Sequence, residues 1–314
     1  MTVFLALVAL ALAGPWGATA AARRLAALLP PREACLALTG AAVLLAGGTV
    51  AALVALFHVP FLASLERLPL SRVVAEWPAV VPVSGLAGAV LAVQAVLLVR
   101  RWYEHRALLA RAWASTGDGV ADGDVLVVPG GDAEAFALPA FRGRPGRVVV
   151  TAGMVRALGP AEREVLLAHE RAHLAGRHHL LSAVADLAAA VHPALRGLRE
   201  ALGFHLERWA DEAAAGSVGD RRLAATAIAR AALAGSAAVR AGGSRNPLLS
   251  VGAGPVPQRV EALLGSVPVR PHGRALRVGV VCLVAVTAVS LLSLGLAYGL
   301  HEYVEYAAEA VRGR

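Results

Sequence analysis

The segment 169–173 reads His-Glu-Arg-Ala-His, and the spacing of its two histidines and its glutamate is typical of a metal site. In a helix, His169 and His173 occupy positions i and i+4 of one face, so both imidazoles can reach the same metal ion. Glu170 lies beside them, where its carboxylate can accept a proton from water at the metal without binding the ion. This chemistry suits zinc, which takes imidazole nitrogens and a carboxylate oxygen in a tetrahedral site with one position left for water.

A zinc site of this kind needs a third protein ligand, which must come from outside the motif. The candidate residues are Glu200, His205, Glu207, Asp211 and Glu212. Glu207 and Asp211 are four residues apart in a segment with a helical pattern and therefore share a face. Glu207 could bind the metal while Asp211 accepts a hydrogen bond from a ligand histidine. The spacing alone also fits a solvated acidic face paired with Arg208 or Arg171, so the third ligand stays open at this point.

The other polar residues near the motif carry weaker signals. His178 and His179 could bind a second metal, but their position just past the predicted end of the helix favours polar contacts. His192 precedes a proline and is interpreted as structural. Arg171 and His205 could stabilise an oxyanion, although no pattern supports either role.

The segments around the motif predict a small α+β domain. Pro160 opens a helix with acidic residues in its first turn, and this helix carries the motif and ends near Gly176. Short strands are predicted at 124–129 and 147–151, where β-branched residues gather. A further helix is predicted at 198–215, and it would carry the acidic candidates for the third ligand.

Two more segments of this domain are distinctive. The apolar stretch 180–191 carries Asp186 and is short for a membrane span. It is predicted to be a helix packed in the domain or lying against the bilayer, with a re-entrant segment as the alternative. The stretch 242–257 is rich in Gly, Ser and Pro and is predicted to be a loop.

The composition predicts a membrane protein, because 57% of the residues are hydrophobic, whereas soluble chains have about 45–50%. The predicted membrane helices are four apolar runs at about 2–22, 34–57, 83–99 and 275–300. The first run could also be a signal peptide, but its arginine pair follows the run instead of preceding it, which favours a retained helix. Cys35 and Cys282 fall in or beside apolar runs and are interpreted as buried apolar residues.

The net charge of +8 comes from arginines that cluster beside the apolar runs. Because basic flanks face the cytoplasm, the N-terminus is predicted to lie outside a cell membrane that the chain crosses several times. The predicted order is residues 1–103 with three spans and short loops, a cytoplasmic domain at 104–274, the fourth span at 275–300 and an outer tail at 301–314. No nucleic-acid-binding signature accompanies the charge, so no DNA or RNA partner is expected.

Four blocks occur in the order found in one known group of enzymes. They are Ala-Phe-Ala-Leu-Pro at 135–139, Val-Val-Val-Thr-Ala-Gly-Met at 148–154, Leu-Ala-His-Glu-Arg-Ala-His at 167–173 and Glu-Arg-Trp-Ala-Asp at 207–211. This set, within about residues 100–265, resembles the integral-membrane gluzincin peptidases. The resemblance is closest to the β-lactam sensor–transducer metallopeptidases (BlaR/MecR type) and more distant to the heat-shock membrane peptidases of the HtpX and CAAX-prenyl-protease type.

The resemblance implies a zincin-like metallopeptidase domain that holds one Zn²⁺ per chain. It implies that His169 and His173 are zinc ligands, that Glu207 is the third ligand and Asp211 its support, and that Glu170 is the general base. It also implies that the strand 147–151 is the edge strand along which a substrate peptide pairs.

The sequence departs from the family pattern at three places. The sensors carry a large penicillin-binding domain after their last span, whereas only 301–314 stands there in this sequence, so antibiotic sensing by that route is not expected. Glu134 replaces the usual asparagine before Ala-Phe-Ala, and His178 stands where the heat-shock relatives often have an acidic residue.

The sequence thus predicts an α-helical membrane protein with a cytoplasmic α+β zincin-like domain. The expected activity is a zinc-dependent endopeptidase that cleaves a cytoplasmic or membrane protein, either a regulatory partner such as a repressor or a quality-control substrate. The alternative is a non-enzymatic membrane scaffold or a metal-binding signalling module.

Overall fold

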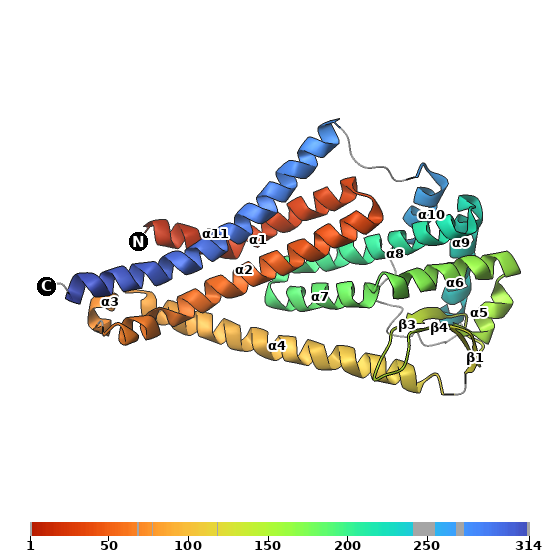
Figure 1. Cartoon of the computed structure of the whole chain (residues 1–314), viewed down its shortest axis with the longest axis horizontal. Coiled ribbons are helices and arrows are strands. Elements are labelled where there is room, and N and C mark those ends of the chain that lie inside the picture. Colours follow the sequence, from red (N-terminus) through yellow and green to blue (C-terminus); the bar gives the residue numbers. More distant parts are fainter. Residues whose placement is uncertain are drawn as a thin grey trace.

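The computed structural model describes residues 2–67, 69–76, 78–117, 119–240, 255–267 and 273–312. Long helices run side by side over most of the molecule, and a small sheet lies at one end with shorter helices around it (Figure 1). The long helices are α1 (Thr2–Leu28), α2 (Pro31–Leu65), α4 (Val80–Ala114) and α11 (Gly273–Arg312). Helix α2 packs against the other three, so it is the central helix of this bundle.

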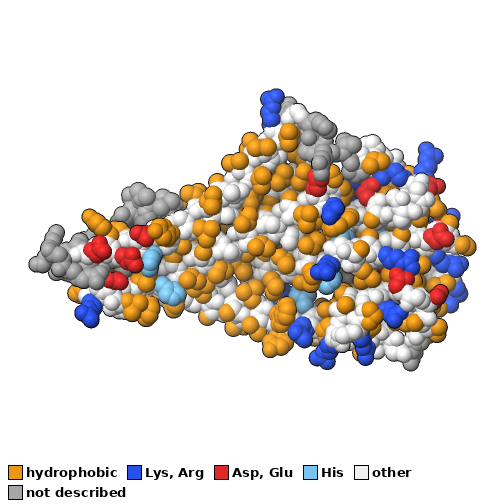
Figure 2. Space-filling model, viewed as in Figure 1, with side chains coloured by type: hydrophobic (Ala, Val, Ile, Leu, Met, Phe, Trp, Pro, Cys, Tyr) orange, Lys and Arg blue, Asp and Glu red, His pale blue; other side chains and the backbone are white. Residues whose placement is uncertain are grey.

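Among the described residues, three helices are long and apolar enough to cross a membrane: α2, α4 and the part of α11 from Leu276 to Tyr303. Helices α2 and α4 each have 35 residues, more than the roughly 20 that a bilayer requires. Their outward side chains include many leucines and valines, and hydrophobic side chains cover this face of the bundle while charged side chains gather towards its two ends (Figure 2). The predicted spans 34–57, 83–99 and 275–300 lie within α2, α4 and α11, respectively.

The predicted count of four spans is not confirmed. The first predicted run, 2–22, belongs to α1, which is not among the three candidate spans in the part of the chain that the structure describes. Helix α1 is 27 residues long and contains Pro15. Its later residues Ala18, Ala22 and Ala26 are buried against α2 and α8, so small side chains let this helix pack closely on the bundle.

The segment 58–82, between the second and third predicted spans, is predicted to be one of the short loops, and this prediction is wrong in part. Helix α2 continues through Pro60 to Leu65, and a short helix, α3 (Leu70–Glu76), follows. The continuation is stabilised because Val59 and Ala63 are buried against Val80 at the start of α4. The burial of apolar residues therefore extends helix α2 into this segment despite its prolines and charged residues.

The sheet has four strands in the order β1 (Val120–Asp122), β2 (Val125–Val128), β4 (Arg147–Thr151) and β3 (Ala135–Leu138). Strand β4 is parallel to β2 and antiparallel to β3. The expectation that 147–151 is an edge strand is therefore wrong, and β3 is the edge strand on that side. The physical reason is burial: Val148, Val149 and Val150 are buried, as expected for a central strand covered on both faces.

Helix α6 (Pro160–Ala175) carries the His-Glu-Arg-Ala-His motif and has the predicted bounds within one residue. At its start, the backbone N–H of Gly159 donates to the Glu162 carboxylate at 2.9 Å, which is one of the two hydrogen bonds of a capping box, since glycine has no side chain to make the other. Arg230 of α9 (Arg221–Arg240) also pairs with Glu162. Helix α6 packs on β3 and β4 on one side and on α8 (Arg196–Val218) and α9 on the other.

Helix α7 (His178–Val191) follows α6 and confirms the helix predicted at 180–191. It packs against α2, α4 and α8, so its apolar residues are used in contacts with the long helices. Helix α5 (Ala152–Ala157) joins β4 to α6, and α10 (Val256–Leu264) packs on α8 and α9. Residues 242–254 of the predicted loop 242–257 lie outside the described residues, whereas 256–257 belong to α10. Residues 270–272, just before α11, also lie outside the described residues.

Candidate metal centre

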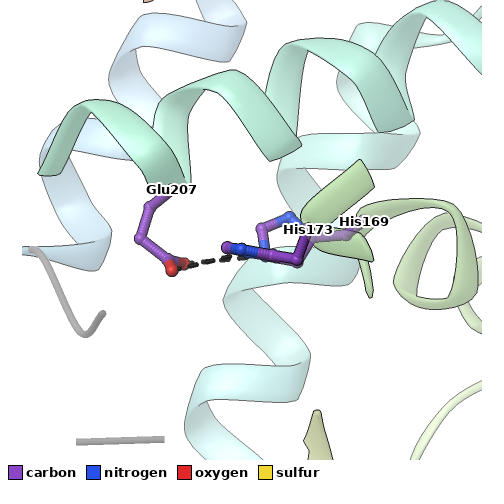
Figure 3. Close-up of side chains that lie close together, drawn as sticks. All are labelled: His169, His173 and Glu207. Carbon is purple, nitrogen blue, oxygen red and sulfur yellow. Dashed lines mark hydrogen bonds and ion pairs between the residues drawn. The ribbon is translucent and has the colours of Figure 1, made fainter. Parts of the chain in front are cut away.

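His169, His173 and Glu207 lie together, although 34 residues separate the second histidine from the glutamate. Their ligand atoms all lie within 4.8 Å of one another, with α6 supplying the imidazoles and α8 the carboxylate (Figure 3). The Nε2 atoms of the two histidines are 3.1 Å apart. The Glu207 oxygens lie 3.6 Å from Nε2 of His169 and 3.5 Å from Nε2 of His173. The structure thus brings the three predicted ligands to one point.

The donor set fits a zinc ion. Two imidazole nitrogens and one carboxylate oxygen are a common set for a catalytic zinc site, which keeps a fourth position for water or substrate. The side chains of the three residues retain between 8% and 17% of their exposed area, so a small molecule can reach them. Among the described residues, no other group of three or more His, Cys, Asp or Glu side chains converges in this way.

Glu170 is buried beside this cluster at 8% exposure. Burial raises the pKa of its carboxyl to about 7, while the nearby His169 and the backbone N–H of Ala137 on β3 act in the opposite direction. A carboxyl group with this pKa is half ionised near neutral pH, which is the range in which a general acid–base group works best. Since Ala137 belongs to β3, the Glu170 carboxyl lies close to the edge strand.

Asp211 lies one helical turn beyond Glu207, as the sequence predicted, and its Oδ1 is 3.0 Å from Nδ1 of His169. Burial lowers the pKa of His169, but the carboxylates of Asp211 and Glu207 more than offset this and raise it to about 10. The two carboxylates thus surround His169 with negative charge. Asp211 contacts the nitrogen that does not face the cluster, so it orients the ring.

Arg259 of α10 completes the cluster, and sequence reasoning missed it. Its guanidinium donates two hydrogen bonds to Asp211 at 2.7 and 2.6 Å and lies 2.8 Å from Oε2 of Glu207. Burial raises the pKa of both carboxyls, but His169, His173 and Arg259 lower that of Glu207 to about 2. Arg259 and His169 lower that of Asp211 to about 2. The position of Arg259 in the sequence could have indicated that it is buried, because it lies among Val256, Val260 and Leu263 on the apolar face of a short helix.

His178 contacts the second predicted ligand. Its Nδ1 lies 2.8 Å from Nδ1 of His173, and it is buried at 3% exposure at the start of α7. The expectation of a polar contact past the end of α6 is therefore confirmed. His178 therefore places an imidazole next to His173 at the position where an acidic residue is often found in the heat-shock peptidases that the sequence resembles.

The remaining candidates for the third metal ligand lie outside the converging group. Glu212 pairs with Arg208 and Arg221, and Arg171 makes two hydrogen bonds of 2.7 Å with Asp124 at the start of β2. Glu200 is exposed, and neither it nor the buried His205 belongs to the converging group. The carboxylates of Glu207 and Asp211 pair with Arg259, so their predicted alternative partners Arg208 and Arg171 are not used.

Comparison with known families gives a match over the part of the chain that builds this centre. Residues 119–246 match the model for peptidase family M48. Neither the search of curated proteins nor that of solved structures found a match. The matched segment contains all four strands, α5 to α9 and the predicted site residues, but it ends before Arg259. The narrower resemblance to BlaR/MecR-type sensors stays a prediction. This chain therefore contains a peptidase family M48 domain at residues 119–246.

Proposed function

We propose that the protein is a membrane-embedded zinc endopeptidase in which His169, His173 and Glu207 bind one Zn²⁺ per chain. The observation that carries the proposal is the convergence of these side chains beside the buried Glu170, inside a segment that matches a peptidase family. When bound, zinc supplies Lewis acidity, which polarises a peptide carbonyl and makes water acidic enough to lose a proton near neutral pH.

Glu170 is the proposed general base. Its carboxylate accepts a proton from the attacking water and then passes it to the nitrogen of the leaving amine. Burial raises its pKa to about 7, which suits both steps, because the group must first accept and then give up the same proton. Asp211 and Arg259 hold the neighbouring groups in place: Asp211 orients His169, and Arg259 neutralises part of the negative charge of the two carboxylates.

The open edge of β3 is the proposed binding surface for the substrate backbone. The N–H of Thr151 donates to the carbonyl of Glu134, and hydrogen-bonded pairs alternate along an antiparallel ladder. The polar backbone groups of Ala135 and Ala137 therefore face away from β4. An extended peptide that pairs with Ala135 and with the carbonyl of Ala137 lies next to Glu170, because the N–H of Ala137 is directed at the Glu170 carboxylate.

The orientation in the membrane follows from the distribution of arginines along the chain. Arg23, Arg24, Arg100 and Arg101 flank the apolar segments on the side of the M48 domain, which favours a domain in the cytoplasm with the N-terminus and the 301–314 tail outside. The substrate is then a cytoplasmic or membrane protein. A repressor or another regulatory partner fits this arrangement, and so does a membrane protein under quality control.

A comparison of Glu170→Gln with Glu164→Gln tests the proposed activity. Glu164 is an exposed residue on the same helix, so its variant is a matched control. New protein N-termini are mapped by mass spectrometry in membranes from cells that express each form. We expect a set of N-termini that the wild type and Glu164→Gln produce and Glu170→Gln does not, while all three forms bind equal zinc. The same N-termini in all forms, with zinc intact, would instead support the non-enzymatic scaffold.

A further inference from the structure

Trp209 lies on α8 between the metal centre and the long helices. Its ring centre is 4.5 Å from that of His178, with an angle of 50° between the planes. His178 in turn lies against His173, with 2.8 Å between their Nδ1 atoms and 4.6 Å between ring centres. The indole is therefore one side chain away from a proposed metal ligand.

Packing, not hydrogen bonding, fixes the far side of the His178 ring. Its Nε2 is buried and has no hydrogen-bond partner among the described residues. A Cβ atom at Gly176 would lie 2.4 Å from this nitrogen, so the ring sits directly on the backbone of that glycine. The ring of Trp209 also packs against His178, at 4.5 Å between ring centres. Without it, His178 could rotate away from His173, because a single contact to Nδ1 does not define the orientation of the ring.

The indole is held in turn by the start of α2. The guanidinium carbon of Arg32, the second residue of this helix, lies 5.8 Å from the ring centre of Trp209, within the range of a cation–π contact. Trp209 also packs against the buried cluster that Ala34, Cys35 and Leu38 of α2 form with residues of α1, α7, α8 and α11. One continuous set of contacts thus joins a candidate membrane span to the metal centre: Arg32, Trp209, His178 and His173.

We infer that Trp209 is a positioning residue that holds His178 against His173, and that Arg32 holds Trp209 from α2. The inference rests on the proposed metal site. The physical reason is that the group bound to the second nitrogen of a ligand histidine sets the direction of its metal-binding lone pair. The geometry of the zinc site then depends on the position of α2. A movement of this helix in the membrane changes the orientation of the His173 ring.

The test measures metal binding in the detergent-solubilised full-length chain. The dissociation constant for Zn²⁺ is obtained by competition with a chromophoric chelator, and the absorption spectrum of bound Co²⁺ reports ligand geometry. The variants are Trp209→Leu, Trp209→Phe and Arg32→Gln. Trp16→Leu is the matched control for the first, because Trp16 also packs on a histidine, His192, at a ring distance of 6.0 Å. Arg24→Gln controls for the loss of an exposed arginine at the same end of the bundle.

We expect Trp209→Leu to raise the Zn²⁺ dissociation constant by about 10-fold or more and to change the Co²⁺ spectrum. Trp209→Phe should retain most of the wild-type affinity for Zn²⁺, because it keeps an aromatic face against His178. Arg32→Gln should weaken binding by about two- to fivefold, and the two controls should match the wild type.

Unchanged zinc affinity and Co²⁺ spectra in Trp209→Leu and Arg32→Gln, even with lower thermal stability, would overturn the inference and leave the metallopeptidase proposal intact. If Trp209→Leu does not fold, wild-type affinity in Arg32→Gln is enough to overturn the link to α2. Absence of zinc binding by the wild type would overturn both proposals.

Discussion

Arg259 binds Asp211 through two parallel hydrogen bonds of 2.6 and 2.7 Å, in a position where both side chains are buried. The same guanidinium lies 2.8 Å from Glu207. Two carboxylates that share a buried site repel each other, and a single arginine fork between them offsets this repulsion. Helix α10 therefore contributes the positive charge of the metal centre, although it lies beyond the segment that matches the M48 family.

Replacing Arg259 should destabilise the fold. In Arg259→Met the carboxylates of Asp211 and Glu207 lose their buried counter-ion, which should cost about 3–5 kcal/mol of folding free energy. The measurement is the midpoint of thermal unfolding in detergent, with Gln258→Ala as the control at the exposed neighbouring position. Adding Asp211→Asn to Arg259→Met should recover part of the loss. Equal midpoints for Arg259→Met and Gln258→Ala would show that the ion pair does not stabilise the fold.

The third ligand is tested by the amount of zinc per chain. We expect about one zinc in the wild type and much less in Glu207→Ala, because two imidazoles alone bind zinc weakly. Glu200→Ala is the matched control, since Glu200 is exposed on the same helix and outside the converging group. Zinc is measured by atomic emission after dialysis of the purified protein. A full complement of zinc in Glu207→Ala would assign the third ligand to another residue.

The features that the sequence predicted correctly are those set by neighbouring residues. The bounds of α6 follow from Gly159, Pro160 and Glu162, and the shared face of His169 and His173 follows from helical spacing. The features that it predicted wrongly or missed depend on distant parts of the chain. Whether β4 is central or at an edge depends on where β2 and β3 pair, and the valines of β4 indicate a strand that is covered on both faces without indicating which strands lie beside it. Arg259 meets Asp211 across 48 residues, and only its place on an apolar helix face hinted at a buried role.

His178 provides a direct test of how the second ligand histidine is supported. Its Nδ1 lies 2.8 Å from that of His173, so His178→Leu should weaken zinc binding by about 10- to 100-fold. His178→Asp should retain affinity, because a carboxylate is the stronger acceptor for an N–H of a ligand histidine. His179→Leu is the control, since it changes the next residue of the same helix. The measurement is zinc affinity by chelator competition, and equal loss in His178→Leu and His179→Leu would contradict a specific role for His178.

Gly153 tests the packing that connects the sheet to the motif helix. It lies at the start of α5, where Thr151 accepts a hydrogen bond from the N–H of Met154 and donates one to the carbonyl of Asp132. A Cβ atom at position 153 would lie 2.3 Å from the carbonyl oxygen of Gly131 and 2.4 Å from that of Asp132. Since backbone atoms cannot move aside cheaply, Gly153→Ala should destabilise the fold by about 1–3 kcal/mol.

The matched control for this change is Gly216→Ala. Gly216 lies inside α8, and a Cβ atom there would have no neighbour among the described residues within 4 Å, so alanine should stabilise the helix by about 0.5–1 kcal/mol. Thermal unfolding of the two variants in the same detergent gives the comparison. Opposite shifts of the midpoint are expected, because one methyl group meets backbone oxygens and the other meets open space. A Gly153→Ala protein as stable as the wild type would mean that the 130–132 segment moves freely, and that the close contact does not fix this segment to α5.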